Sequence, residues 1–265
     1  MTAVRKYIRL YRLLCAQYLK ARMSYRTDFL VSMVFMFIWF LPSFFSVVVL
    51  FTNIPSLAGW SLEELVFVYG FYMLAMVPNG VFFQNVWQLP WQVRRGDFIK
   101  YYFRPLNMMF YYMSEVIDIN SLNAIPIGAG LMIWASVRLG IVWTAGRIVL
   151  TIILLFSASL IVCALMVASA STAFWLTNSH SLLNLVSRFR ENARYPMSMY
   201  NTIIRFAFSF LLPIGFMAYY PSLLILRPVD AGFFPWMTPL IGGASFTLAC
   251  LIWTKGARKW SGTGT

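Results

Sequence analysis

Five long stretches of the chain carry no charged residue. They run from Phe29 to Ser61, Leu65 to Val93, Ile148 to Ser187, Phe206 to Leu226 and Ala231 to Thr254. A sixth stretch, Leu106 to Val137, is interrupted only by Glu115 and Asp118. About 20 apolar residues cross a hydrocarbon core about 30 Å thick, so each stretch is long enough to span a membrane. None shows the polar face of a helix in a soluble bundle. The pattern predicts an all-α membrane protein with six transmembrane helices.

We place the spans at residues 28–52, 62–88, 106–137, 145–178, 199–226 and 232–254. Most of the 21 Lys and Arg residues precede the first span, follow the second or fourth span, or lie in the C-terminal tail. Cytoplasmic segments carry the basic excess, so this side and both termini are expected to be cytoplasmic. The topology therefore accounts for the net charge of +13 without a nucleic-acid partner.

Residues 1–27 form a separate region with its own pattern. Val4, Ile8, Tyr11, Cys15 and Tyr18 recur at helical spacing beside several arginines, and no cleavable signal peptide is evident. We interpret this region as an amphipathic helix on the inner membrane surface, in contact with lipid phosphates. The alternative is a cytoplasmic extension of the first span. Residues 28–265 then form the membrane domain and a short tail.

Residues for catalysis or metal binding are scarce. Charged residues make up 11% of the chain, against about 25% in soluble domains. No glycine is followed by lysine, so the chain lacks the phosphate-binding loop of ATPases. His180 is the one histidine, and the three cysteines are scattered, so we expect no catalytic residue and no metal site. The chain is expected to move or bind something rather than to catalyse a reaction.

The segment after the second span, QVRRGDFIKYYFRPLN, combines basic and aromatic residues around Gly96-Asp97. A short element held between two spans is suited to act as a lever for a soluble partner. The other interpretation is a plain basic loop that follows the topology rule. Composition alone leaves both open.

Two carboxylates interrupt the third predicted span. Glu115 and Asp118 are three residues apart, which places them on one face of a helix, and Asn120 and Asn123 follow. Such groups at membrane depth line a pathway or pair with other polar groups. The alternatives are a pathway strip and a structural cluster near the inner interface, paired with neighbours such as Arg104.

Three prolines punctuate the fifth span and its approach. We expect Pro196 to mark a helix start, Pro213 a break and Pro221 a helix end. A break at Pro213 would allow a hinge or a re-entrant turn.

Two segments carry a resemblance to a known family. RRGDFIKYYFRPLN, residues 94–107, and YPMSMYNTIIRFAFSFLLPIGFMAYYPSLLIL, residues 195–226, resemble the coupling loop and the broken fifth region of type-2 ABC exporter permeases. The resemblance covers nearly the whole chain and is to a six-span branch of largely uncharacterised substrate. It implies a non-catalytic permease subunit of an ATP-driven exporter in the bacterial cytoplasmic membrane.

The resemblance also implies partners. Two copies of a soluble ATPase, which bind ATP and Mg, would dock on the loop containing Arg94, Arg95, Gly96, Asp97 and Phe98. A second permease, identical or homologous, would complete the pathway, and this chain itself would hold no cofactor. One alternative is a secondary carrier driven by an ion gradient through Glu115 and Asp118. A membrane-embedded enzyme or assembly factor is a further alternative, weakened by the lack of catalytic residues.

Overall fold

The computed structural model describes residues 56–260 and eleven scattered positions between Tyr11 and Phe51. The predicted surface helix at 1–27 and most of the predicted first span at 28–52 lie outside the described residues. Within the described part every regular element is helical, and Leu57 and Trp60 form one isolated bridge. The all-helical prediction is confirmed for this part of the chain.

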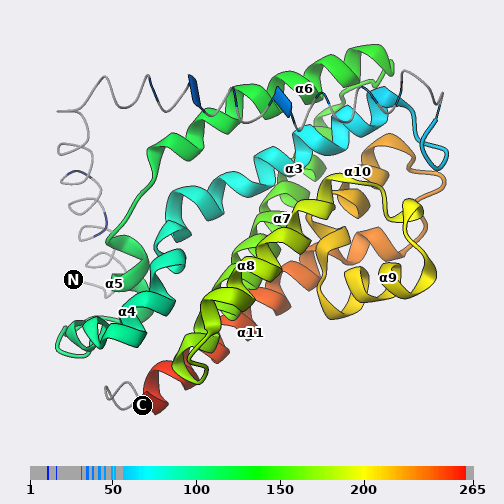
Figure 1. Cartoon of the computed structure of the whole chain (residues 1–265). Helices are drawn as coiled ribbons and strands as arrows, with labels where there is room; N and C mark the ends of the chain where they lie inside the picture. The colour runs from blue at the N-terminus through cyan, green and yellow to red at the C-terminus, as the bar shows by residue number, and fades with distance from the viewer. Residues whose placement is uncertain are drawn as a thin grey trace.

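The helices that build the molecule follow one another with short connections (Figure 1). The α-helices are α3 (Leu62–Phe83), α4 (Leu89–Arg95), α5 (Met108–Ser114), α6 (Ala124–Arg138), α7 (Ala145–Ser171), α8 (Ser179–Arg190), α9 (Thr202–Phe206), α10 (Tyr219–Leu226) and α11 (Thr238–Lys259). The short 3-10 helices are η1 (Gln84–Gln88), η2 (Asp97–Tyr101), η3 (Ile119–Asn123), η4 (Thr172–Phe174), η5 (Glu191–Arg194), η6 (Met197–Met199), η8 (Ile214–Met217) and η9 (Phe234–Met237), and η7 (Ala207–Leu211) is a π-helix.

Three helical segments among the described residues are long and apolar enough to cross a membrane. They are Leu62–Arg95, Ala145–Phe174 and Phe234–Lys259, and a bent pair raises the number to four. They correspond to the second, fourth and sixth predicted spans, although the first and third of these segments extend several residues further than predicted. We call the end of the molecule with α4 and the last turns of α11 the α4 end, and the opposite end, where α3 begins, the Glu64 end.

The third predicted span is not one helix, which corrects the sequence-based assignment. α5 ends at Ser114, the chain breaks, and η3 with α6 continues at an angle of 69° to α5. Glu115 closes α5, and Asp118 caps η3 by accepting a hydrogen bond from the Asn120 amide at 3.2 Å. The two carboxylates therefore flank a break instead of sharing one helical face. Free amides at a helix start need an acceptor, and Asp118 supplies it.

Glycines allow the main helices to pack closely. A Cβ atom added at Gly70 of α3 would lie 2.7 Å from the Gly128 carbonyl oxygen of α6. Likewise, one at Gly242 of α11 would lie 2.6 Å from the carbonyl oxygen of Ser157 in α7. Such contacts leave no room for a side chain, so the paired backbones meet directly, as small residues permit in membrane proteins.

The basic segment after the fourth span forms a helix that returns into the molecule. α8 begins at the α4 end, where the His180 ring lies 5.4 Å from the Trp91 ring. It then runs back beside α7 (Figure 1). The predicted connecting loop between residues 178 and 199 therefore contains a helix, Ser179–Arg190, that packs on α7. Counting basic residues could not reveal this, because the topology rule weighs charge and ignores contacts within the protein.

The fifth predicted span is also interrupted. α9 continues into the π-helix η7, which ends at Leu211, and Pro213 precedes η8, so the expected break at Pro213 is confirmed. Pro196 precedes the short helix η6, in agreement with a helix start. Pro221 is the third residue of α10, so its assignment to a helix end is wrong. Proline fits a first helical turn because its missing N–H has no partner there.

Candidate functional site

The segment between α3 and α5 forms a compact projection at the α4 end. Pro90 stands in the first turn of α4, which ends at Gly96. Gly96 has a φ of 80°, a left-handed conformation that glycine adopts without strain. The chain then turns directly into η2. The expected lever is thus a short helix, a glycine turn and a 3-10 turn.

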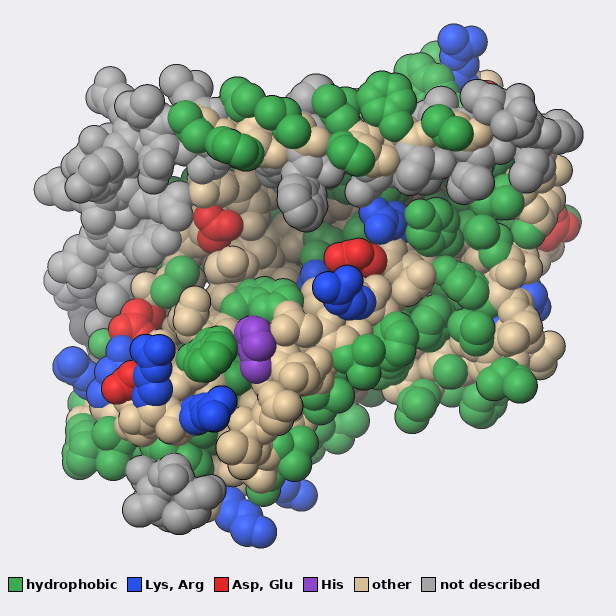
Figure 2. Space-filling view, viewed as in Figure 1, with side chains coloured by type: hydrophobic (Ala, Val, Ile, Leu, Met, Phe, Trp, Pro, Cys, Tyr) green, Lys and Arg blue, Asp and Glu red, His purple; other side chains and the backbone are tan. Residues whose placement is uncertain are grey.

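This projection presents a mixed basic and apolar surface. Its exposed side chains include Trp91, Arg94, Arg95, Asp97, Ile99, Lys100, Tyr102, Phe103 and Arg104. Figure 2 shows Lys and Arg side chains gathered over α4, with acidic side chains beside them. Exposed aromatic and apolar groups among cations are typical of surfaces that bind protein partners.

Phe98 differs from its neighbours in this segment because its side chain is fully buried. Its ring contacts six others, with centroid distances of 5.1 to 6.1 Å. The contacting rings are Tyr101, Tyr102, Tyr112, Phe174, Trp253 and Trp260. They come from η2 and the residue after it, from α5 and η4, and from the end of α11 with the residue after it. Phe98 therefore anchors the projection to three other segments and presents no surface to a partner.

Two tyrosines of the projection reinforce this anchor. The Tyr102 hydroxyl donates to the Ala257 carbonyl of α11, and its ring stacks on Trp260 at 5.9 Å. The Tyr101 hydroxyl donates to the Glu115 carboxylate. Burial raises the pKa of both phenols, and the Glu115 contact raises the pKa of Tyr101 further. Both hydroxyls therefore stay protonated and remain donors at neutral pH.

The acidic residues of the third predicted span are engaged in local structure. Glu115 also contacts Lys100, with Oε1 and Nζ 3.3 Å apart. Arg104, its partner in one sequence-based interpretation, lies over the Tyr111 ring instead. Asp118 accepts from the Ser121 hydroxyl at 3.0 Å as well as from the Asn120 amide. These contacts favour the structural cluster over a pathway strip.

Unpaired amide groups lie near the same break. Asn120 Oδ1 and Asn123 Nδ2 are buried without a partner, as is Asn79 Oδ1 of α3. η3 packs on α3 here, and the Asp118 amide donates to the Val81 carbonyl at 3.2 Å. The predicted asparagines therefore stand beside the carboxylates at the α3–η3 contact.

Sequence reasoning missed two arginines in the interior. Arg190 ends α8 and is 8% exposed, and its Nε and Nη1 atoms have no partner. The Arg194 guanidinium lies 5.9 Å from the centre of the Tyr69 ring. Tyr69 and Tyr72 stand about 10 and 15 Å along α3 from its first residue, well inside a spanning helix. η5, which contains Arg194, packs on this helix.

Comparison with known families decides the class of this molecule. A family model described as "ABC-2 family transporter protein" matches residues 37–264. The chain belongs to the ABC-2 transporter family. No curated protein and no solved structure matches it. The permease is thus a multi-pass membrane protein of a transport system, and the fold described above is its membrane component.

At the Glu64 end of the ABC-2 permease, a salt bridge joins the residue after α10 to the first turn of α3. Arg227 donates from Nε and Nη2 to the two carboxylate oxygens of Glu64, each at 2.6 Å. Its Nη2 also donates to the Gly59 carbonyl at 2.7 Å, and its guanidinium covers the Trp60 ring. Hydrogen bonding to Glu64 raises the pKa of Arg227. Ser61 and Glu64 also form a capping box at the start of α3, which is a recognisable sequence signal for this end.

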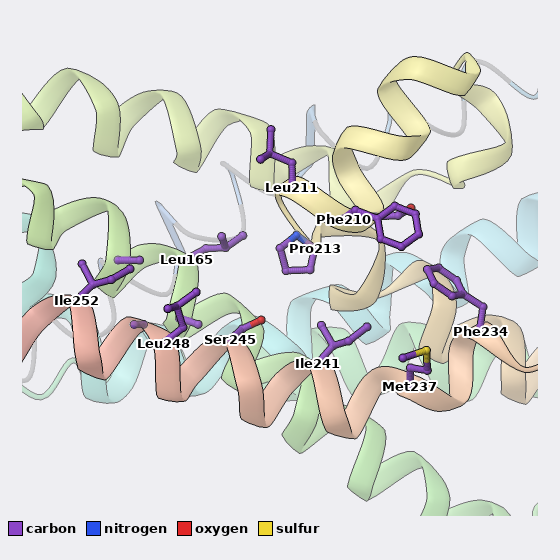
Figure 3. A pocket seen from close by; sticks show the side chains of 14 residues that line it. Leu165, Phe210, Leu211, Pro213, Phe234, Met237, Ile241, Ser245, Leu248 and Ile252 are labelled. Carbon is purple, nitrogen blue, oxygen red and sulfur yellow. The ribbon is translucent and has the colours of Figure 1, made fainter.

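The permease also has an apolar cavity of about 400 Å³ between α7, η7 and α11. Figure 3 shows Ile241, Ser245, Leu248 and Ile252 in a row along α11, on the side that faces Pro213 and Phe210. The remaining lining residues are Ala164, Leu165, Ala168, Ser209, Leu211, Phe234, Met237 and Ala249. The break at Pro213 therefore borders a cavity within the spanning part of the molecule.

Proposed function

We propose that this permease is the membrane subunit of an ATP-driven exporter and forms half of its translocation pathway. A separate ATPase, present in two copies and holding ATP and Mg, docks on the exposed side of α4 and η2. The observation that carries this proposal is the contrast within the projection. Its outer side chains are cationic and aromatic, whereas Phe98 fixes its inner side to α5, η4 and α11.

This anchoring gives the projection a mechanical role. If the ATPase displaces α4, the residues packed around Phe98 must move with it, because close-packed side chains transmit strain. The displacement passes through the rings around Phe98 to the ends of α5, α7 and α11. Closure of the two ATPases would thus tilt the spanning helices and change access to the pathway.

The second half of the pathway is a second permease, identical or homologous. α8 supports this part of the proposal, because it places exposed Arg188 and buried Arg190 beside the spanning helix α7, although Leu185 and Phe189 are exposed on it as well. Figure 2 shows charged side chains in the middle of this face, between α3 and α8. Charges at membrane depth face protein or water rather than lipid. We infer that this face lines the pathway and meets the partner permease.

The location that fits is the bacterial cytoplasmic membrane, with the α4 end on the cytoplasmic side. The basic residues of α4 and of the last turn of α11 obey the topology rule in this orientation. The ATPase then meets the projection in the compartment that contains ATP. The chain itself needs no cofactor for this role.

The test is co-purification after charge reversal at the docking surface. Arg94→Glu with Arg95→Glu should abolish recovery of the ATPase with the tagged permease, because both charges face the proposed partner. Arg138→Glu is the matched control, since Arg138 is equally exposed at the end of α6. The double variant should still insert and keep its thermal stability. Full recovery of the ATPase with that variant would contradict the docking assignment.

The carrier alternative receives no comparable support. Glu115 is held by Tyr101 and Lys100, and Asp118 caps η3, so neither carboxylate is free to cycle an ion. Gradient-driven transport by the purified permease alone would nevertheless establish that mechanism. The decisive measurement is substrate uptake into vesicles with a proton gradient and without ATP.

A further inference from the structure

The cavity beside the Pro213 break is built for a hydrocarbon chain. Its lining is apolar except for the hydroxyls of Ser209 and Ser245. The Ser209 hydroxyl is already hydrogen-bonded to the Tyr220 hydroxyl at 2.7 Å. A polar ligand would find almost no hydrogen-bonding partner here, whereas an alkyl chain needs none.

The cavity opens toward the bilayer. Phe210, Leu211 and Leu248 line it and are 63%, 76% and 58% exposed. Leu248 lies in the spanning segment Phe234–Lys259, and Phe210 and Leu211 end the apolar helix Thr202–Leu211 beside it, so we place their exposed surfaces at hydrocarbon depth. Molecules that reach the opening from this side are lipids or other membrane-dissolved amphiphiles.

The wall formed by α11 continues into a basic end. The lining residues Ile241, Ser245, Leu248 and Ile252 follow a spacing of four, three and four residues. The next positions of the same spacing are Lys255 and Lys259, both exposed and both within α11. Residues at this spacing lie on one face of a helix. One face of α11 therefore presents an apolar groove and then two cations.

The distances match one lipid leaflet. Ser245 and Lys255 are ten residues apart, or about 15 Å along the helix, which is half of a hydrocarbon core about 30 Å thick. If the phosphate of a lipid lies at Lys255 and Lys259, its acyl chain is long enough to enter the cavity between Leu248 and Pro213. Basic groups at a membrane surface attract anionic head groups.

We propose that this groove is a binding site for an anionic lipid, with one acyl chain in the cavity and the head group on Lys255 and Lys259. The chain fills the space left where η7 ends and the backbone turns at Pro213. The bound lipid thereby supports the broken segment that precedes α10. The ligand is either a resident phospholipid or a transported amphiphile of the same chemistry.

The test is photo-crosslinking in nanodiscs of phosphatidylcholine. The anionic probe is a trace of phosphatidylglycerol that carries a diazirine near the end of one acyl chain. Phosphatidylcholine with the same diazirine has no net charge and is the control probe. Labelled peptides are mapped by mass spectrometry. The wild-type permease should be labelled at the cavity residues of α11 and η7, with preference for the anionic probe. Ile133 and Val137 of α6, exposed to ordinary lipid, serve as the internal reference.

Two sets of variants separate head group from chain. Lys255→Gln and Lys259→Gln should each lower the anionic preference about fivefold, as expected for one basic residue at a membrane surface. Arg138→Gln is the control, an exposed arginine at the end of α6 and away from this groove. Ser245→Phe should reduce labelling in the cavity and leave α6 labelling unchanged, whereas Leu240→Phe, exposed outside the cavity, should change neither.

Equal labelling of α11 and α6 by the anionic probe, or an anionic preference that survives both lysine substitutions, would overturn the proposal. Binding is measured on the permease itself, so the result does not depend on an ATPase partner. Adding ATP and Mg to the assembled exporter then assigns the source. Labelling that falls under turnover identifies a transported amphiphile, and labelling that persists identifies a resident lipid.

Discussion

The two ends of the permease are closed by different kinds of contact. At the α4 end, rings from η2, α5, η4 and α11 surround Phe98 in a packed cluster. At the Glu64 end, the pair of Glu64 with Arg227 ties the start of α3 to the end of α10. Packing distributes a load over many contacts, whereas an ion pair concentrates it in a few hydrogen bonds. The first end is therefore held by many small contacts, and the second by a few strong ones.

The largest effect is expected from removing the centre of the cluster. Phe98→Ala deletes a fully buried ring and should lower stability by about 3–5 kcal/mol. Thermal unfolding in detergent, followed by tryptophan fluorescence, measures the loss. Phe103→Ala, in the same projection but 78% exposed, is the control and should shift the midpoint little. Similar shifts for both variants would mean that the cluster does not hold the projection.

A smaller effect is expected at the other end. Glu64→Gln removes the charge that accepts both Arg227 hydrogen bonds and should cost about 2 kcal/mol. Glu63→Gln on the neighbouring residue, which shares the first turn of α3, is the control. Adding Arg227→Met to Glu64→Gln should restore part of the loss, because the unpaired cation is then gone. A double variant less stable than both singles would argue against direct coupling.

The smallest effect is expected at the rim of the cluster. Lys100→Gln breaks an exposed ion pair with Glu115, and such pairs contribute about 0–1 kcal/mol. Glu115 keeps its hydrogen bond from Tyr101, so the break after α5 should persist. The same unfolding assay, repeated at high salt, should show no difference between the variant and the wild-type permease. A loss as large as that of Phe98→Ala would place the ion pair at the centre of the fold.

Much of this architecture is predictable from the sequence. Uninterrupted apolar stretches identify α3, α7 and α11, because helices that are apolar on all sides and long enough to cross a bilayer are typical of membrane spans. The turn at Gly96 and the break at Pro213 follow from the backbone properties of glycine and proline. The exposed arginines of α4 follow from the basic pattern of that segment. All of these signals are local.

The features that escaped prediction depend on distant contacts. Glu64 and Arg227 are separated by 163 positions, and no local pattern pairs them. The break after Glu115 depends on Asp118 finding free amides, which periodicity cannot show. Phe98 resembles its exposed neighbours in sequence and is buried only because α5, η4 and α11 converge on it. The return of α8 into the molecule is hidden by its basic composition.

The packing of α8 against earlier helices has a consequence for the order in which the helices assemble during biosynthesis. α8 carries three arginines with its η5 extension, too polar to enter a bilayer by itself. α8 packs on α7 and η5 packs on α3, and both α7 and α3 are synthesised before them. We therefore expect the nascent segment to stay at the membrane surface until the earlier helices have assembled, and then to pack along them. A delay or error in that last step would yield a chain that is fully inserted at its long helices yet has no completed interior.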